Sequence, residues 1–188
     1  RMGGGDKGLR LVGGRPLMDH VIDRLAPQVG ALAINANGDP ARLAGFGLPV
    51  LADSLPDRPG PLAGVLAGLD WAAAQGATAI VTAAADTPFF PRDLVARLQA
   101  GAGPHGLCLA ASPDDQGRLQ RHPTFGLWPV ALRDDLRAAL TGGLRKIVLW
   151  TDGHGAGTAR FDSQPFDPFF NINTPEDIAV AETLMGQA

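Results

Sequence analysis

Three short apolar runs in the first half of the chain lack the alternation of hydrophobic and polar positions that marks a half-exposed strand. They cover residues 29–34, 48–52 and 77–85, and Gly, Pro or Asp bounds them. Continuous runs of this length are typical of strands that are covered on both faces, as in a parallel sheet. The pattern therefore predicts three buried parallel strands.

Two segments next to these runs carry apolar residues three or four positions apart, which is the spacing of an amphipathic helix. They cover residues 17–25 and 62–74. An alternation of strand and helix indicates βαβ units with right-handed crossovers. The expected fold class is α/β, with a mostly parallel sheet and helices on both faces.

The second half of the chain has weaker signals. Pro91 is well placed to begin a helix through residue 98, and the Gly-rich residues 101–106 end it. Late helices are expected near residues 132–140 and 175–185, and Thr174 with Asp177 is typical of a helix cap. No repeat or linker divides the chain, so we expect one domain over residues 1–188.

Two further strand candidates, residues 107–111 and 123–128, flank the polar stretch SPDDQGRLQRH. This stretch predicts a mobile loop or the arm of a hairpin. Residues 112–122 are therefore exposed and form a candidate docking surface for another protein, although exposure is the ordinary property of any such loop.

Composition narrows the class of protein. The chain has 188 residues, of which 45% are hydrophobic and 19% charged, which suits one globular domain. The single Cys108 excludes an internal disulfide framework, and no apolar run approaches the ~20 residues of a membrane span. We expect a cytoplasmic protein without a membrane segment. The net charge of −3 argues against bulk nucleic-acid binding.

The first fifteen residues are locally basic, because they hold Arg1, Lys7, Arg10 and Arg15 against one acidic residue. Such a segment can hold a small polyanion such as a nucleotide, and it can equally be a solvated surface. Lys7 is one of only two lysines among the sixteen Lys and Arg residues. A lysine provides a compact point charge for phosphate, so Lys7 is a candidate for chemistry.

The stretch GGGDKG surrounds Lys7. Successive glycines let backbone N–H groups approach phosphate oxygens closely. The stretch is not a Walker loop, because glycine rather than Ser or Thr follows the lysine. A flexible turn is the alternative explanation.

Asp86 follows the third apolar run, in the stretch AIVTAAADTPFF. Its carboxylate is thus expected at the ligand-binding edge of the sheet, where it is a candidate ligand for Mg²⁺, which takes one or two protein carboxylates together with phosphate oxygens and water. A helix cap or an Asx turn is the alternative role.

Other polar residues follow strand candidates in the same way. Asn35, Asn37, Asp53 and the turn at residues 60–64 should face the same edge, where Asn and Asp can hydrogen-bond a base or a ribose. The stretch FFNINTPED places Asn171 and Asn173 on one side of an extended segment, within reach of a metal or a phosphate. Turn formation and helix capping are the alternatives.

Five stretches together resemble one family. RMGGGDKGL, NAN, DSLPDRPGPLAG, DTPF and NINTPED occur in this order along nearly the whole chain, as they do in the molybdenum cofactor guanylyltransferases. The resemblance implies a Rossmann-like, doubly wound nucleotidyltransferase fold. It also implies a nucleotide-binding N-terminal half and a molybdopterin-binding C-terminal half.

The resemblance further implies an activity, in which the terminal phosphate of molybdenum-carrying molybdopterin attacks the α-phosphorus of GTP and pyrophosphate leaves. The implied cofactor is Mg²⁺, and the implied partners are GTP, molybdopterin and molybdoenzyme apoproteins or their chaperones. By the same resemblance, catalysis falls to Lys7 and Asp86, nucleotide binding to Gly3, Gly4, Lys7, Asn35, Asp53 and Asp86, substrate binding to Arg1, Gly64, Asn171 and Asn173, and metal binding to Asp86.

In the family, a strand and a Leu-Ala-Gly-Gly turn come before the first of these stretches. We therefore expect such a strand before Arg1. That turn lies against the base, so a cytidylyltransferase for the same cofactor stays an alternative, as does a sugar-phosphate nucleotidyltransferase. A protein of another class, which carries the finished cofactor without chemistry, would not need a metal-binding carboxylate at Asp86.

Overall fold

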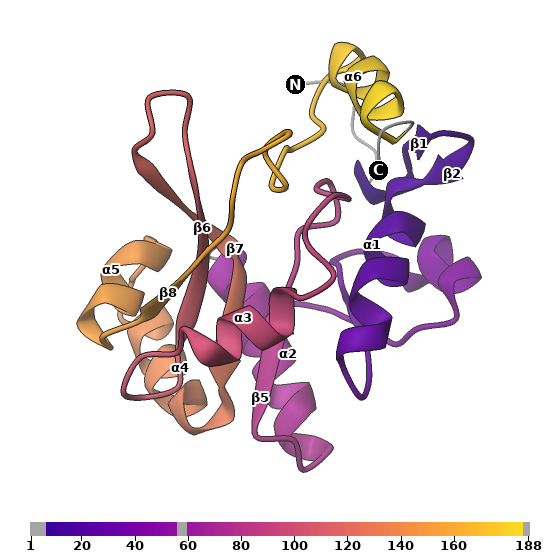
Figure 1. The fold of residues 1–188 in the computed structure, drawn as a ribbon. Helices are drawn as coiled ribbons and strands as arrows, with labels where there is room; N and C mark the ends of the chain where they lie inside the picture. The colour runs from indigo at the N-terminus through magenta and orange to yellow at the C-terminus, as the bar shows by residue number, and fades with distance from the viewer. Residues whose placement is uncertain (1–6, 56–59, 186–188) are drawn as a thin grey trace.

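The computed structural model describes residues 7–55 and 60–185 (Figure 1). Its central sheet has four strands in the order β5-β7-β6-β8. These are β5 (Ala79–Thr82), β7 (Leu119–Pro129), β6 (Cys108–Pro113) and β8 (Gly157–Arg160). Two smaller pairs are the parallel strands β3 (Ile34–Asn35) and β4 (Val50–Leu51) and the antiparallel hairpin of β1 (Leu11–Val12) and β2 (Arg15–Pro16).

Helices cover both faces of the sheet, as expected. Successive side chains of β6 point to opposite faces, so that Cys108 packs in one cluster and Leu109 in another. The helices of the Cys108 side are α1 (Leu17–Leu25) and α3 (Leu94–Ala100), and those of the Leu109 side are α2 (Pro61–Ala74), α4 (Arg133–Thr141) and α5 (Ile147–Gly153). The α/β class with helices on both faces is confirmed.

The sheet is mixed in direction. β6 and β8 are parallel, whereas β7 is antiparallel to both β5 and β6. A five-residue turn, 114–118, joins β6 to β7, and so short a connection can only return the chain in the opposite direction. This hairpin is the detail that the continuous apolar runs of the first half did not indicate.

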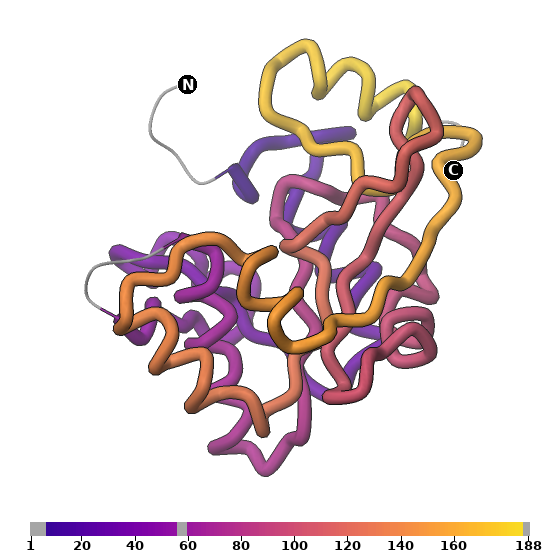
Figure 2. The backbone as a smooth tube through the Cα atoms, turned by 90° about the vertical axis from the view of Figure 1, so that its left-hand side faces the viewer, coloured from indigo at the N-terminus to yellow at the C-terminus, as the bar shows by residue number. Residues whose placement is uncertain are grey.

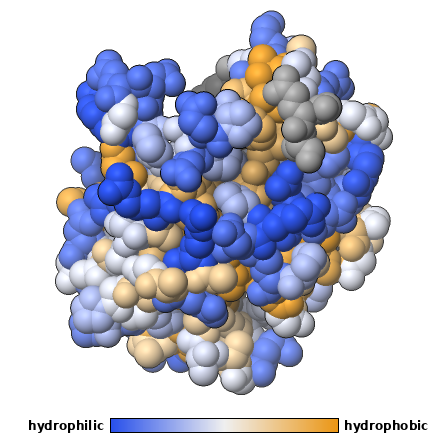
Figure 3. Space-filling view, in the orientation of Figure 1, coloured by the Kyte–Doolittle hydropathy of each residue, from blue (hydrophilic) through white to orange (hydrophobic). Residues whose placement is uncertain are grey.

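The polar stretch between β6 and β7 is the arm of this hairpin, which projects from the sheet in Figure 1 and carries hydrophilic side chains at its tip in Figure 3. Asp114 closes the turn, since its carboxylate accepts the backbone N–H groups of Gln116 and Arg118. The Arg118 amide, foremost among these contacts, holds the pKa of the Asp114 carboxyl below its usual value. The role of the arm as a docking surface stays a prediction.

A groove separates β3 from β5, and its volume is about 650 Å³. Apolar side chains of α1, α2 and β5 line most of it, among them Val21, Val65 and Val81. Among the described residues, β3 pairs only with β4, and β5 pairs only with β7. The strand expected before Arg1 lies outside the sequence and stays a prediction.

The strand expectations were right in position and too long. Only Ile34 and Asn35 of the run 29–34 form ladder hydrogen bonds, and only Val50 and Leu51 of the run 48–52 do. Apolar character marks a buried segment, but the hydrogen-bonded length depends on the partner strand. The sequence did not indicate β8 and α5, because β8 has a single buried residue and α5 spans only two turns.

The last helix, α6 (Pro175–Met185), begins where its sequence predicts. Thr174 Oγ1 accepts the N–H of Asp177 at 3.2 Å, and the Asp177 carboxylate accepts the N–H of Thr174 at 2.8 Å. Pro175 occupies the first helical position, where a missing N–H costs nothing. The pair is therefore a capping box, with Asp in the place of the usual Glu.

We expect Thr174→Ala to lower the free energy of unfolding by about 1 kcal/mol, because the helix loses its cap. Urea denaturation followed by circular dichroism measures the change. Thr183→Ala is the matched control, since the Thr183 hydroxyl binds the carbonyl of Ala179 within the same helix and caps nothing. Equal losses in the two variants would contradict the capping role.

Candidate functional site

Two polar clusters from distant parts of the chain line one cavity of about 350 Å³. Lys7, Asp86 and Asn171 belong to the first cluster, and Asn35 belongs to the second. The cavity thus takes residues from both halves of the chain. Its other lining residues are mostly small or apolar, among them Gly8, Met18, Leu43 and Ala85.

The first cluster centres on the carboxylate of Asp86. The ammonium of Lys7 lies 2.9 Å from Asp86 Oδ2, and the side-chain amide of Asn171 donates to Asp86 Oδ1 at 3.1 Å. Lys7 Nζ also donates to Asn173 Oδ1. The structure therefore brings together four residues that the sequence separates by up to 166 positions.

Backbone contacts place these side chains. Asp86 lies four residues beyond the end of β5, and its carbonyl accepts the N–H of Ile172 at 2.8 Å. This bond fixes the segment of Asn171 and Asn173 against the sheet edge. The N–H of Asn173 binds the Asp177 carboxylate of the capping box, and this amide, together with that of Thr174, lowers the pKa of the Asp177 carboxyl. The start of α6 thereby orients Asn173.

The second cluster joins the ends of β3 and β4. Asn35 Nδ2 donates to Asp53 Oδ1 at 3.0 Å and to the Leu51 carbonyl at 3.1 Å. Asn37 Nδ2 donates to Asp53 Oδ2 at 2.8 Å, and its Oδ1 accepts the N–H of Asp53. Because β3 and β4 are parallel, the residues after them meet at one edge, as the sequence predicts.

Gly64 requires a correction. The resemblance assigned it to a tight turn that faces the substrate, but it lies inside α2, and the preceding turn is at Gly60, whose φ of 91° favours glycine. A Cβ on Gly64 would overlap the side-chain oxygen of Asn35. Gly64 also lines the large apolar groove, not the 350 Å³ cavity. The glycine therefore makes room for Asn35.

Three of the expected site residues lie outside the described residues. These are Arg1, Gly3 and Gly4, and their assignment to the nucleotide loop stays a prediction. Gly8, which ends the stretch GGGDKG, is buried and packs on Met18.

Sequence reasoning missed two residues of the site. Arg10 donates to the backbone carbonyl of Asn173 at 2.8 Å, and its place in the basic N-terminal segment was the only signal. Thr124 lines the cavity because the β6–β7 ladder slips there, between Leu109 and Ala110. Pro123, which has no N–H to pair, lies in the slipped part of β7.

The donor set around Asp86 suits Mg²⁺. Asp86 Oδ2 and Asn173 Oδ1 already converge on one cation, the Lys7 ammonium, and oxygen atoms are the ligands that Mg²⁺ prefers. Within the described ranges no three His, Cys, Asp or Glu residues are grouped as metal ligands. A site with one carboxylate is typical of Mg²⁺ bound together with phosphate oxygens and water.

Comparisons with known proteins agree with this geometry. Residues 1–154 match the model of the MobA-like NTP transferase domain. A molybdenum cofactor guanylyltransferase of Rhodopseudomonas palustris (strain BisB5) is 54% identical over 98% of this chain and 88% of its own length. The molybdenum cofactor guanylyltransferase of Nitrobacter hamburgensis is 50% identical over the same shares.

Solved structures support the fold. Molybdopterin-guanine dinucleotide biosynthesis protein A from Archaeoglobus fulgidus superposes with a TM-score of 0.69 at 21% identity, over 98% of this chain and 93% of that one. The 2-C-methyl-D-erythritol 4-phosphate cytidylyltransferase of Thermus thermophilus gives 0.67 at 20% identity, over 97% and 95%. The expected Rossmann-like nucleotidyltransferase fold is confirmed. No helix in the described parts of the chain is long and apolar enough to span a membrane.

Proposed function

The chain belongs to the MobA-like NTP transferase family and is one of its molybdenum cofactor guanylyltransferases, and from this premise we propose how its cavity works. The substrates are GTP and molybdenum-carrying molybdopterin. The observation that carries the proposal is the convergence of Lys7, Asp86 and Asn171 in one cavity with Asn35 at its other side.

The triphosphate lies beside Lys7 in this proposal. The Lys7 ammonium is held by Asp86 and Asn173 at the cavity wall, and half of the side chain is exposed. An ammonium on a flexible stem can follow a phosphate group as its charge changes. Arg10 lies three residues further on and adds a second positive charge to the same segment.

The nucleoside lies beside Asn35 and Asp53. Asn35 gives both N–H groups to Leu51 and Asp53, so its Oδ1 is its remaining polar atom. The Asp53 carboxylate accepts from Asn35 and Asn37 and has lone pairs left for a ribose hydroxyl or a base N–H. Fixed hydrogen bonds within the cluster hold these acceptors in place before the nucleotide arrives.

Group transfer needs no covalent enzyme intermediate. An oxygen of the molybdopterin phosphate forms a bond to the α-phosphorus of GTP, the bond to the bridging oxygen breaks, and pyrophosphate leaves with the electron pair. The chain contributes positioning and charge: Lys7 offsets negative charge on the phosphates, and Asn171 with Asn173 orients the pterin phosphate or completes the metal site. Asp86 and Asn173 hold Mg²⁺, whose chemistry when bound is neutralisation of phosphate charge.

Pyrophosphate release tests the proposal. We expect release from the protein with molybdenum-loaded molybdopterin, Mg²⁺ and GTP, and little release when CTP replaces GTP. Release with CTP alone would assign a cytidylyltransferase. Release with neither nucleotide would contradict nucleotidyl transfer to molybdopterin and favour a carrier or a sugar-phosphate enzyme.

Three expectations from the sequence stay predictions within this proposal. They are the cytoplasmic location, the transfer of the product to molybdoenzyme apoproteins or their chaperones, and the division into a nucleotide-binding and a molybdopterin-binding half. The single cysteine, Cys108, is buried and unpaired, which agrees with a reducing compartment.

A further inference from the structure

A buried polar cluster joins the base of the hairpin arm to the segment that leads to α6. The Ser112 side chain in β6 lies 2.7 Å from His122 Nε2 in β7 and 3.1 Å from Asp167 Oδ1. Ser112 is 1% exposed, and none of the three residues lines the 350 Å³ cavity. A buried hydroxyl costs free energy unless its hydrogen bonds are made, so this contact is a specific one.

The hydroxyl proton orders the cluster. Ser112 donates its one proton to the Asp167 carboxylate, so Ser112 Oγ accepts from His122 and the imidazole carries its proton on Nε2. Burial lowers the pKa of His122, and the Asp167 charge opposes this shift. With its Nε2 protonated, His122 cannot take the proton of Ser112. The cluster is thus no hydrolytic triad, although it contains Ser, His and Asp.

The cluster holds a turn from two sides. Asp167 Oδ1 also accepts the N–H of Phe169 at 3.0 Å, and the Asp167 carbonyl accepts the N–H of Phe170. The His122 ring stacks on the Phe169 ring with their centres 4.3 Å apart. Figure 2 shows this segment as the orange to yellow tube that leads from β8 to α6. The conformation of residues 167–170 is therefore fixed by the base of the arm.

Asn171 follows this turn directly. Its amide binds the Asp86 carboxylate, and the next N–H, that of Ile172, binds the Asp86 carbonyl. We propose that Ser112, His122 and Asp167 are positioning residues, which hold Asn171 against Asp86 for catalysis without touching the substrate. The inference rests on the proposed function only for the role of Asn171.

Kinetics gives the first test. We expect Ser112→Ala to lower kcat by about 10-fold, since small displacements of a catalytic group are costly, and to change KM for GTP little, because the Asn35 cluster is untouched. In an Asn171→Ala background the same change should have little further effect. Independent, multiplying effects of the two substitutions would overturn the proposal.

Hydrogen exchange gives a second test, which needs no substrate. We expect the amides of Phe169 and Ile172 to exchange faster in Ser112→Ala than in the unaltered protein. Thr151→Val is the matched control, because it removes another fully buried hydroxyl, in α5, far from this turn in the contact network. Unchanged exchange at Ile172 would overturn the proposal even if guanylyl transfer is found, and faster exchange would support it even if that activity is absent.

Variants of Asp167 repeat both tests at a partly exposed position, where folding is less sensitive. Asp167→Ala removes the acceptor for Ser112 and Phe169 and should reproduce the loss of Ser112→Ala. Asp167→Asn keeps a side-chain oxygen at the same place and should restore most of kcat and of the amide protection. A loss that is equal in both Asp167 variants would contradict positioning through the hydrogen bonds.

Discussion

Asp86→Asn is expected to lower the rate of pyrophosphate release by at least about 100-fold, with little change in folding. The substitution keeps the shape of the side chain and removes the charge that holds Lys7 at 2.9 Å and that would bind Mg²⁺. The Lys7–Asp86 pair is partly exposed, so its loss should cost only about 1 kcal/mol of stability or less. Steady-state kinetics and thermal unfolding separate the two effects.

Metal binding gives an independent measurement on the same variant. Mn²⁺ can replace Mg²⁺ as an oxygen-bound probe, and its paramagnetic resonance reports the bound fraction. We expect Asp86→Asn to weaken Mn²⁺ binding by about 10-fold or more, because the amide brings no negative charge. Unaltered Mn²⁺ binding together with lost activity would assign the carboxylate to the phosphates or to Lys7 alone.

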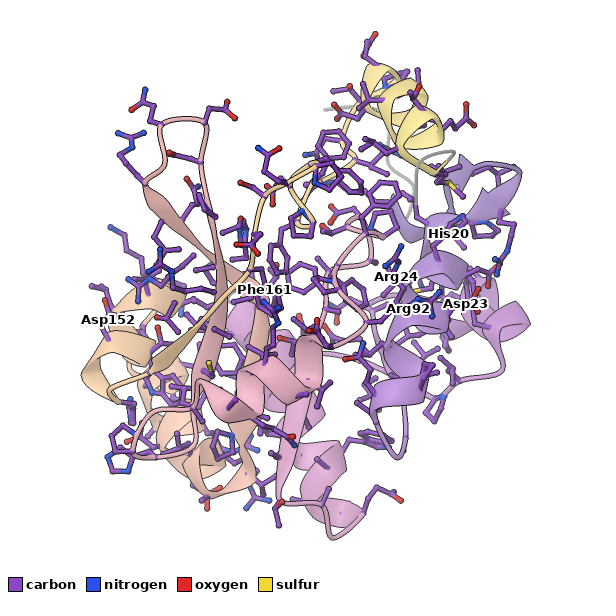
Figure 4. All side chains as sticks on the ribbon, viewed as in Figure 1. His20, Asp23, Arg24, Arg92, Asp152 and Phe161 are labelled. Carbon is purple, nitrogen blue, oxygen red and sulfur yellow. The ribbon has the colours of Figure 1, made fainter. Side chains whose placement is uncertain are left out.

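Asp152→Asn is the control for loss of one carboxylate. Asp152 forms an ion pair with Arg121 and lies on α5, on the opposite side of the molecule from α1 in Figure 4. Its substitution should leave pyrophosphate release within about twofold, as for most surface changes. Full activity of Asp86→Asn would contradict the catalytic assignment and revive the carrier hypothesis.

The sequence predicts those parts of the site that depend on local pattern. Asn35 and Asp53 follow neighbouring parallel strands, and their meeting at one edge follows from that topology alone. Thr174 and Asp177 form a cap whose geometry needs only three residues of helix. Such features survive in any fold that keeps the same elements.

Other parts of the site depend on contacts between distant segments. The bond from Lys7 to Asn173 and the turn held by Ser112 join elements that no periodicity relates. β8 pairs with β6 at the edge of the sheet, and the pattern of its own four residues does not mark it as a strand. The family resemblance indicated Lys7 and Asn173 as site residues, but their mutual contact comes from the structure.

The role of Gly64 combines both kinds of information, and Gly64→Ala should raise KM for GTP by about 10-fold or more, which is about 1.4 kcal/mol of binding. A methyl group at this position overlaps the side-chain oxygen of Asn35, which must then leave its place between Leu51 and Asp53. Alanine favours a helix interior over glycine by about 1 kcal/mol. Activity and helix propensity are thus expected to move in opposite directions.

Gly153→Ala is the matched control, because Gly153 also lies in a helix and a Cβ there meets no atom within 4 Å. It should leave KM for GTP unaltered. In an Asn35→Ala background, Gly64→Ala should have little further effect on KM, because the shortened side chain no longer meets the added methyl group. An unaltered KM in Gly64→Ala alone would separate Asn35 from nucleotide binding, whereas a rise that persists without the Asn35 amide would mean that Gly64 acts through the backbone of α2.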